Sequence, residues 1–468
     1  MSDREKPPAR ITSGGFARGF RVTRMGMLGG ARMAAHSVGN WVLGDKDRAA
    51  RQDALWKKQM QMWVQEAGAL KGSLLKAGQM LALYGEPFLP KDAVALLRTL
   101  ESQAPPVSFD SVREVLVADL GQQTFDVLRV DPKPLGAASL GQVHRATTPD
   151  GQAIALKVQY PGVADAVDSD LRAIRRLMGA FRVMLPKEAI DQLFDEVREV
   201  LLRELDYRRE LAETDHFRAG LAGIVGLKVP ETFPRYSSGR VLATSFEPGV
   251  SAKDATVQAL GQDRRNRLAK LYFELYLYEL FVLKRIQTDP HLGNFRIVID
   301  PTEGGQDSLV LLDFGAAREV PEHYVRTYRR MMRGCLYDRR QDILDAGLEL
   351  GLVYHDDPPK AETAFVDMCR LISEPFSSKD TPGRNDSLFL PDGAYDYRKS
   401  DLPKRVASRG RELGLMRGVR MPPSETFFLD RKLAGTYHFL VAVGAQLNAR
   451  ELLERYLEPE PPAAASQP

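Results

Sequence analysis

Thr288-Asp289-Pro290-His291-Leu292-Gly293-Asn294-Phe295, followed closely by Leu311-Leu312-Asp313-Phe314-Gly315, is the part of the sequence that decides the fold. It contains three side chains suited to holding a metal ion and phosphate: Asp289, Asn294 and Asp313. The two segments are separated by short apolar runs, residues 296–300 and 308–312, which predict two strands. We therefore expect a loop, a strand, a turn, a second strand and another loop.

The spacing of these polar residues is typical of a protein-kinase nucleotide site. In that fold an Asp and an Asn five residues later form the catalytic loop, and the Asp of an Asp-Phe-Gly sequence after the next hairpin holds metal. Asn294 follows Asp289 at this spacing, and Asp313 begins such a sequence. An isolated Asp-Phe-Gly also occurs in ordinary turns, so the remaining parts of a nucleotide site must be sought upstream.

Two upstream features fit a nucleotide site. Residues 134–146 predict two strands joined by a small-residue loop, which lets backbone N–H groups approach phosphates. The small residues of this loop are Gly136, Ala137, Ala138 and Ser139. Lys157 lies in the apolar run 152–158, within an Ala-Leu-Lys-Val sequence that matches the third strand of kinases. The alternative for Lys157 is a strand residue that faces solvent.

A run of charged residues lies in the segment 191–219, which we predict to be one long helix. On such a helix Asp206 and Glu210 share a face, whereas Glu204 points away from both. The alternative interpretation of this run is a solvated helix face.

The bulk composition indicates an intracellular globular protein. The chain has 468 residues, enough for two or three domains or for one large domain with additions. Its net charge of +3 argues against a dedicated nucleic-acid binder, so we expect no nucleic-acid partner. Two cysteines suit a reducing compartment, and the predicted location is cytoplasmic. No uncharged apolar run approaches the length needed to span a bilayer.

The N-terminal region is basic. Between Lys6 and Gly44 there are six basic residues and no acidic one, with apolar residues among them. Residues 10–44 are therefore a candidate for lying on an anionic membrane surface, at the inner face of the membrane. The alternative is a flexible arm that packs on its own protein.

With these residues assembled, the chain resembles the ABC1/UbiB family of atypical kinases, which includes the Coq8-type proteins of coenzyme Q biosynthesis. The resemblance covers about residues 70–319 and extends more faintly to residues 431–435. Lys76-Ala77-Gly78-Gln79 matches the KxGQ motif of an N-terminal extension over the active site. Residues 136–139 stand where the family has an alanine-rich loop, with Gly136 in place of the first alanine.

The resemblance implies a role for each remaining candidate residue. Lys157 would contact the α- and β-phosphates of ATP, and Glu210 would pair with it. Asp289 would be the candidate catalytic base or water-orienting residue. Asn294 and Asp313 would hold Mg²⁺. The regulatory lid would consist of Lys76, Gln79, Glu204 and Asp206.

The implied fold is α+β and protein-kinase-like, with a small antiparallel sheet in the N-terminal lobe, a mostly helical C-terminal lobe and a helical N-terminal extension. The predicted divisions are a basic arm (1–48), the KxGQ extension (49–125), the two lobes (126–250 and 251–458) and a disordered tail (459–468).

The implied function is ATP hydrolysis, or phosphate transfer to a small molecule or lipid, in support of isoprenoid-quinone biosynthesis. A lipid or quinone precursor is the expected second ligand. Gln287 stands where conventional kinases have a histidine, two residues before Asp289. This departure favours the alternative of a membrane-associated, nucleotide-binding pseudokinase scaffold.

Overall fold

The computed structural model describes residues 73–85, 94–95, 97, 106–178, 187–302, 304–381, 383–417 and 423–458. The predicted basic arm and C-terminal tail lie outside these residues. The chain separates into two compact units. The first contains the described residues up to Ala212 together with Thr232–Phe246, and the second contains Glu213–Glu231 together with the described residues from Glu247 onward.

The first unit is built on a four-stranded antiparallel sheet in the order β1-β2-β3-β5. The strands are β1 (Arg129–Ala137), β2 (Gly141–Thr147), β3 (Ala153–Gln159) and β5 (Val241–Ser245). Strand β2 turns into β3 at Gly151, whose φ of +85° suits glycine and whose N–H donates to Thr148 O. Strand β1 is an edge strand that is irregular around Pro134, because proline has no N–H to donate to the ladder.

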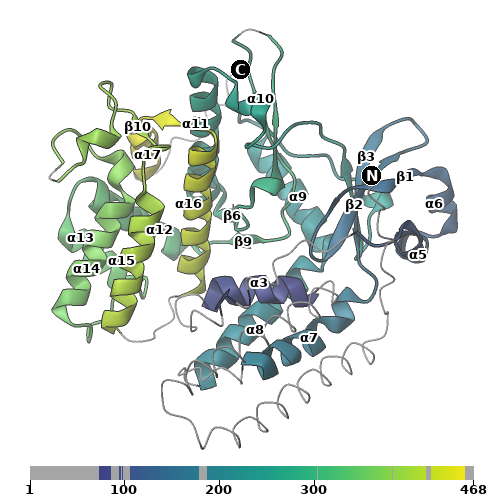
Figure 1. Ribbon diagram of the computed structural model, residues 1–468, viewed down its shortest axis with the longest axis horizontal. Coiled ribbons are helices and arrows are strands. Elements are labelled where there is room, and N and C mark those ends of the chain that lie inside the picture. The colour runs from purple at the N-terminus through teal and green to yellow at the C-terminus, as the bar shows by residue number, and fades with distance from the viewer. Residues whose placement is uncertain are drawn as a thin grey trace, which may run out of the picture. The chain divides into compact units, whose positions relative to one another are not determined.

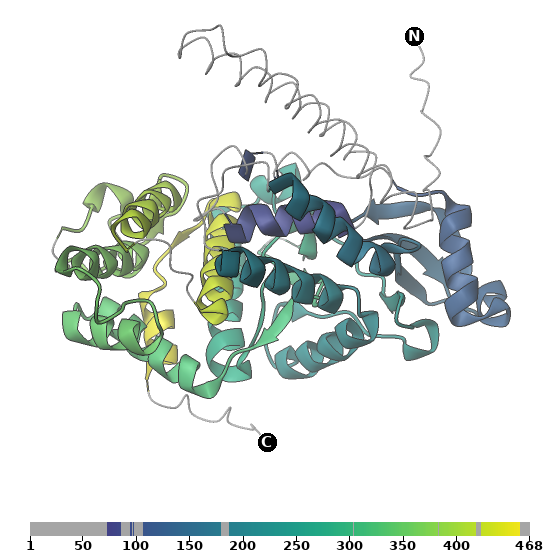
Figure 2. The ribbon, with the colours of Figure 1, turned by 90° about the horizontal axis from the view of Figure 1, so that it is seen from below.

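Helices that precede β1 or lie between β3 and β5 in the sequence complete this unit. They are α3 (Ser73–Gly85), α5 (Phe109–Leu120), α6 (Gln122–Val127), α7 (Val163–Met178), α8 (Lys187–Glu204) and the start of α9 (Tyr207–Leu221). Helix α3 packs against α7 and α8 (Figures 1 and 2). Helix α5 packs on β3 and β5. The buried hydroxyl of Ser73 donates to Asp170 over 2.5 Å and ties α3 to α7.

The prediction of one long helix over residues 191–219 was wrong. The chain forms α8 and α9 instead, with a break at Leu205 and Asp206. At the break, Tyr207 N–H donates to Gly239 O rather than to a residue of α8. Asp206 accepts a hydrogen bond from the backbone N–H of Arg209 over 3.2 Å and so caps the start of α9.

The second unit is mostly helical. Its helices are α10 (Ala255–Gln258), α11 (Gln262–Tyr278), α12 (Glu322–Leu336), α13 (Arg340–Glu349), α14 (Pro359–Ile372), α15 (Leu402–Arg417), α16 (Ser424–Ala442) and α17 (Arg450–Leu457). Strands β7 (Phe295–Val298) and β8 (Ser308–Leu311) form the predicted hairpin, and β4 (Leu227–Lys228) pairs with β8 in parallel. Two further strand pairs are β6 (Arg285–Gln287) with β9 (Ala317–Glu319), and β10 (Tyr395–Asp396) with β11 (Gln446–Leu447).

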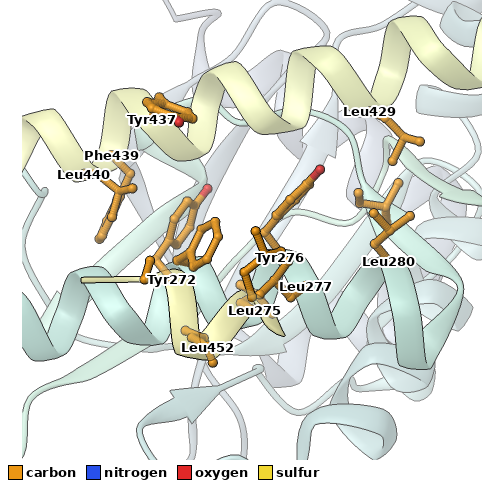
Figure 3. Packing of buried hydrophobic residues seen from close by; sticks show 14 of the residues in the cluster. Tyr272, Leu275, Tyr276, Leu277, Leu280, Leu429, Tyr437, Phe439, Leu440 and Leu452 are labelled. Atoms are coloured by element: carbon orange, nitrogen blue, oxygen red, sulfur yellow. The ribbon is translucent and has the colours of Figure 1, made fainter. Parts of the chain in front are cut away.

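Figure 3 shows the part of the second unit's core that lies between α11 and α16. Tyr272 of α11 stacks on Phe439 of α16 with ring centroids 4.1 Å apart. The apolar residues of the segment 264–287 predict one helix over its whole length, but α11 ends at Tyr278. A single π-helical turn, η3 (Glu279–Leu283), follows α11, and Lys284 then adopts a left-handed conformation with a φ of +52°. This reversal lets Gln287 lie on strand β6 and not on a helix.

Among the described residues, no helix is both long and apolar enough to cross a membrane.

Candidate active site

In the first unit, Lys157 of β3 forms a two-point ion pair with Glu210 of α9. The Nζ atom of Lys157 lies 2.6 Å from Oε1 and 2.9 Å from Oε2 of Glu210. The side chain of Glu210 is only 2% exposed, so the lysine charge offsets the cost of burying the carboxylate. The Nζ atom also lies 5.1 Å from the centre of the Tyr207 ring, which favours a cation. The lysine predicted to contact phosphate and the glutamate predicted to pair with it are therefore brought together.

The break between α8 and α9 places the acidic residues of this segment in different roles. Glu204 ends α8 and pairs with Lys76 of α3 over 2.9 Å. Glu210 lies in the first turn of α9, where the helix dipole favours a negative charge. Asp206 is exposed and caps α9. The expected sharing of one face by Asp206 and Glu210 was therefore based on a helix that does not exist.

Lys76 and Glu204 are the part of the predicted lid that the structure brings into contact. Their side chains are 14% and 13% exposed, which makes this pair better shielded than a surface ion pair. Gln79 follows one turn later on α3 and is half-buried. The regulatory role of these residues stays a prediction.

The small-residue loop is shorter than the sequence indicated. Gly136 and Ala137 belong to the end of β1, where they pair with Val143 and Gln142 of β2. The turn itself begins at Ala138, whose N–H donates to Gly141 O over 2.8 Å, and it includes Ser139. Strand pairing therefore extends into the segment that we expected to be a loop.

In the second unit, Asp289 is held on both sides of its carboxylate. Arg431 of α16 donates to Oδ1 over 2.8 Å, and Asn294 Nδ2 donates to Oδ2 over 3.2 Å. The backbone carbonyl of Asp289 accepts hydrogen bonds from Gln287 Nε2 at 2.8 Å and from Asn294 Nδ2 at 3.1 Å. The residues of the predicted loop around Asp289 are thus linked to one another and to α16 by hydrogen bonds.

Asn294 and Asp313 flank the two strands of the β7–β8 hairpin at the same end. Phe295 pairs with Leu311 across the hairpin, and Leu312 N–H donates to Asn294 O over 2.9 Å. Asp313 follows immediately, and its Oδ1 accepts from Gly315 N–H over 3.0 Å. The hairpin therefore brings these two predicted metal ligands together, although they are far apart in sequence.

The chemistry of this pair fits Mg²⁺. The ion prefers oxygen ligands and is usually held by one or two protein groups together with phosphates and water. Asn294 uses its Nδ2 on Asp289, which leaves the side-chain oxygen as its remaining acceptor. Among the described residues there is no group of three or more His, Cys, Asp or Glu side chains that could hold a metal alone. The arrangement suits a metal that arrives with a nucleotide.

Sequence reasoning missed the contribution of α16 to this site. Arg431 pairs with Asp289, and Lys432 forms a fully buried ion pair with Glu279 over 2.8 Å. The only signal in the sequence was the faint family likeness around residues 431–435, which indicated no contact partner.

Comparisons with known proteins show which family the chain is similar to. A family model described as the ABC1 atypical kinase-like domain matches residues 99–346. The chain is 29% identical to "Probable serine/threonine-protein kinase abkA" of Dictyostelium discoideum, over 83% of this chain and 68% of that protein. It is also 29% identical to "Atypical kinase COQ8, mitochondrial" of Saccharomyces cerevisiae, over 82% of this chain and 73% of that protein.

Among solved structures, the chain is similar to Rv3197 of Mycobacterium tuberculosis, determined as a complex with erythromycin. The TM-score is 0.59 at 23% sequence identity, over 89% of this chain and 99% of that one. At this identity the likeness concerns the fold alone.

Proposed function

Because the chain belongs to the family of ABC1 atypical kinase-like domains and has a kinase-like α+β fold, we propose that it binds ATP with Mg²⁺ and either hydrolyses it or transfers phosphate to a small molecule or lipid. The observation that carries this proposal is the ion pair between Lys157 and Glu210. Kinases need this lysine–glutamate pair in place for phosphoryl transfer.

The proposed roles follow from the surroundings of each side chain. Lys157 holds the α- and β-phosphates, and Glu210 fixes its position from a buried site. Asn294 and Asp313 hold Mg²⁺, which neutralises charge on the phosphates. Asp289 orients the attacking hydroxyl or water, and its carboxylate accepts hydrogen bonds from Arg431 and Asn294. The backbone of residues 136–139 lies against the phosphates.

We assign to the lid a role in selecting the substrate. The ion pair between Lys76 and Glu204 holds α3 to the end of α8 in the first unit. In the family that the chain belongs to, this motif lies over the active site, where a conventional kinase places a peptide. Small or lipid-linked acceptors, or water, are therefore the proposed substrates. Support of isoprenoid-quinone biosynthesis is the corresponding cellular role.

The first test is Mg²⁺-dependent ATP turnover by the purified chain. We expect Lys157→Met to lower turnover by about a hundredfold or more, since it removes the cation that neutralises phosphate. Lys133→Met is the matched control, because Lys133 is an exposed lysine of β1 in the same sheet. Normal turnover by Lys157→Met would contradict the assignment.

The metal ligands are tested by nucleotide binding. A bound nucleotide raises the melting temperature, and chelation of Mg²⁺ with EDTA should remove most of that rise. Asp313→Asn should remove it as well. If Asp313→Asn bound Mg·ATP as the wild type does, the metal assignment would be wrong.

A second candidate function is a nucleotide-binding scaffold without catalysis. Gln287 favours it, because this buried residue stands where conventional kinases have a histidine. Thermal stabilisation by nucleotide without any turnover would support the scaffold and contradict the enzyme.

The cellular role is tested separately by quinone profiles of a strain lacking the protein, rescued with wild type or Asp313→Asn.

The location of the protein and its membrane contact stay predictions. Residues 10–44 lie outside the described residues, and a relative from Saccharomyces cerevisiae is named as mitochondrial. Co-sedimentation with anionic liposomes, with and without residues 1–44, tests the membrane contact. Equal binding of both forms would contradict a role for this arm.

A further inference from the structure

Helix α16 contacts the loop that contains Asp289 through the carboxylate of that residue. Arg431 lies in the second turn of α16 and donates through Nη2 to Asp289 Oδ1. Asn294 occupies the other oxygen of the same carboxylate. The side chains of Arg431 and Asp289 are 19% and 22% exposed, so the ion pair is shielded without being sealed from solvent. Two donors on opposite oxygens restrict the rotation of the carboxylate.

The next residue of α16 supports the same loop from within the core. Lys432 and Glu279 are each 1% exposed and pair over 2.8 Å. The Oε2 atom of Glu279 also accepts a hydrogen bond from Gln287 N–H over 3.3 Å. Gln287 in turn donates to the carbonyl of Asp289. A continuous chain of polar contacts therefore runs from α16 through the π-turn to the loop.

A third contact closes the gap between the helix backbone and the loop. A Cβ atom at Gly435 would overlap the side chain of Pro290 and would lie 3.3 Å from its Cα atom. Glycine is the residue that permits so close an approach of a helix to another segment. Arg431, Lys432 and Gly435 occupy adjoining positions within little more than one turn. We refer to these three residues as the loop clamp.

We propose that α16 positions the candidate catalytic carboxylate, with Arg431 as the positioning residue that fixes the orientation of Asp289. The inference rests on the proposed function, in which Asp289 orients the attacking group. Arg431 acts through Asp289 and has no assigned contact with nucleotide. Its planar guanidinium is suited to this task because it holds a carboxylate in a fixed direction, whereas an ammonium group acts as a point charge.

The kinetic test compares Arg431→Gln and Arg431→Lys with wild type in the full-length chain. A poorly oriented carboxylate slows the chemical step, so we expect Arg431→Gln to lower kcat by about tenfold to a hundredfold. The KM for Mg·ATP should change by less than about threefold, because ground-state binding is retained. Arg431→Lys should recover part of kcat, since it keeps the charge without the planar geometry.

Hydrogen exchange of the loop is measured on the same proteins and does not depend on turnover. Amide exchange of residues 287–294 should be faster in Arg431→Gln than in wild type. Arg405→Gln is the matched control, because Arg405 forms a part-buried ion pair with Glu374 in the same unit and does not contact the loop. It should leave both kcat and exchange of residues 287–294 unchanged.

These measurements separate the possible failures. Unchanged kcat, or a raised KM at unchanged kcat, in Arg431→Gln would overturn the positioning role. A lowered kcat with unchanged exchange would also overturn it, in favour of direct contact between Arg431 and the reacting phosphate. If the wild type showed no turnover, the proposed function would fail. Faster loop exchange in Arg431→Gln would then still support the clamp, and unchanged exchange would overturn it.

Discussion

Two glycines near the predicted phosphate loop differ in what surrounds them. A Cβ atom at Gly141 would lie 3.0 Å from the carbonyl carbon of Val158 and 3.1 Å from the Tyr207 hydroxyl. No atom lies within 4 Å of a Cβ placed at Gly136. Gly141 is therefore required by packing, whereas Gly136 has room for the alanine that the family carries.

This difference gives a prediction about stability. Gly141→Ala should lower the free energy of unfolding by about 1–3 kcal/mol, because the backbone of β3 must move away. Gly136→Ala should leave the melting temperature nearly unchanged and serves as the matched control. Chemical denaturation of both variants checks it, and equal destabilisation would contradict the packing argument.

Residue type and spacing predicted ion-pair partners that both belong to sequence motifs, but not a partner that lies outside them. Lys157 and Glu210 were predicted to pair, since each matched a motif of known role, and they do pair. Arg431 was not predicted, because 142 residues separate it from Asp289 and an arginine in a helix is usually a solvated residue. Long-range ion pairs of this kind carry no local pattern that a sequence can reveal.

Among the elements, periodicity predicted helices well but not their interruptions. Regularly recurring apolar residues predict helices over 324–337, 340–352 and 360–372, and α12, α13 and α14 lie close to these ranges. The break before α9 and the π-turn after α11 were missed. Each depends on a tertiary contact: Tyr207 bonds to Gly239 at the break, and Glu279 pairs with Lys432 at the turn. The sequence pattern continues through both points.

The buried ion pair at the π-turn predicts that the stability of the second unit is sensitive to substitution of Lys432. Burial is the main effect on Glu279 and raises the pKa of this carboxyl, while the charge of Lys432 acts in the opposite direction. Lys432→Met leaves a buried carboxylate without its cation and should cost about 3–5 kcal/mol of stability. Adding Glu279→Gln should restore part of that loss, because the charge is gone.

Urea denaturation of the single and double variants checks this prediction. The control is Arg330→Gln, which breaks an ion pair with Glu349 between side chains that are 45% and 44% exposed. It should cost less than about 1 kcal/mol. A Lys432→Met variant as stable as this control would show that the buried pair does not support the π-turn.

For the whole molecule, the family and the kinase-like fold were predicted from the sequence and are confirmed. Separate motifs in a fixed order carry more information than any single element, which explains this success. The domain boundaries stay predictions, since much of the predicted extension lies outside the described residues.

A pH dependence of folding follows from His144 in the first unit. Its side chain is fully buried, donates through Nδ1 to Asp131 O and accepts at Nε2 from Gln142, which describes a neutral imidazole. Burial lowers the pKa of His144 below its usual 6.5, although Asp131 opposes the shift. The unfolded state therefore takes up a proton first as pH falls. The contribution of neutral, buried His144 to the free energy of unfolding is fully present above pH 6.5. It is lost as the pH falls from 6.5 through the folded-state pKa of His144.

Melting temperatures at about pH 7.5 and about pH 5.5 test this pH dependence. The two conditions lie on the order of one pH unit above and below the pKa of a free histidine. The wild type should lose stability at the lower pH. His144→Gln should lose less, because it removes the titrating group, whatever its stability at neutral pH. His323→Gln, at an exposed position, should behave as the wild type. An identical pH dependence in His144→Gln would contradict the prediction.

The contact between Gly435 and Pro290 also links the evolutionary histories of two distant positions. A larger residue at 435 cannot be accepted while proline occupies 290, so a substitution at one site changes which substitutions are neutral at the other. Homologues with a larger residue at position 435 should therefore carry a smaller one at 290, or a shifted helix. Such epistasis would constrain sequence drift in the second unit even where neither residue touches a substrate.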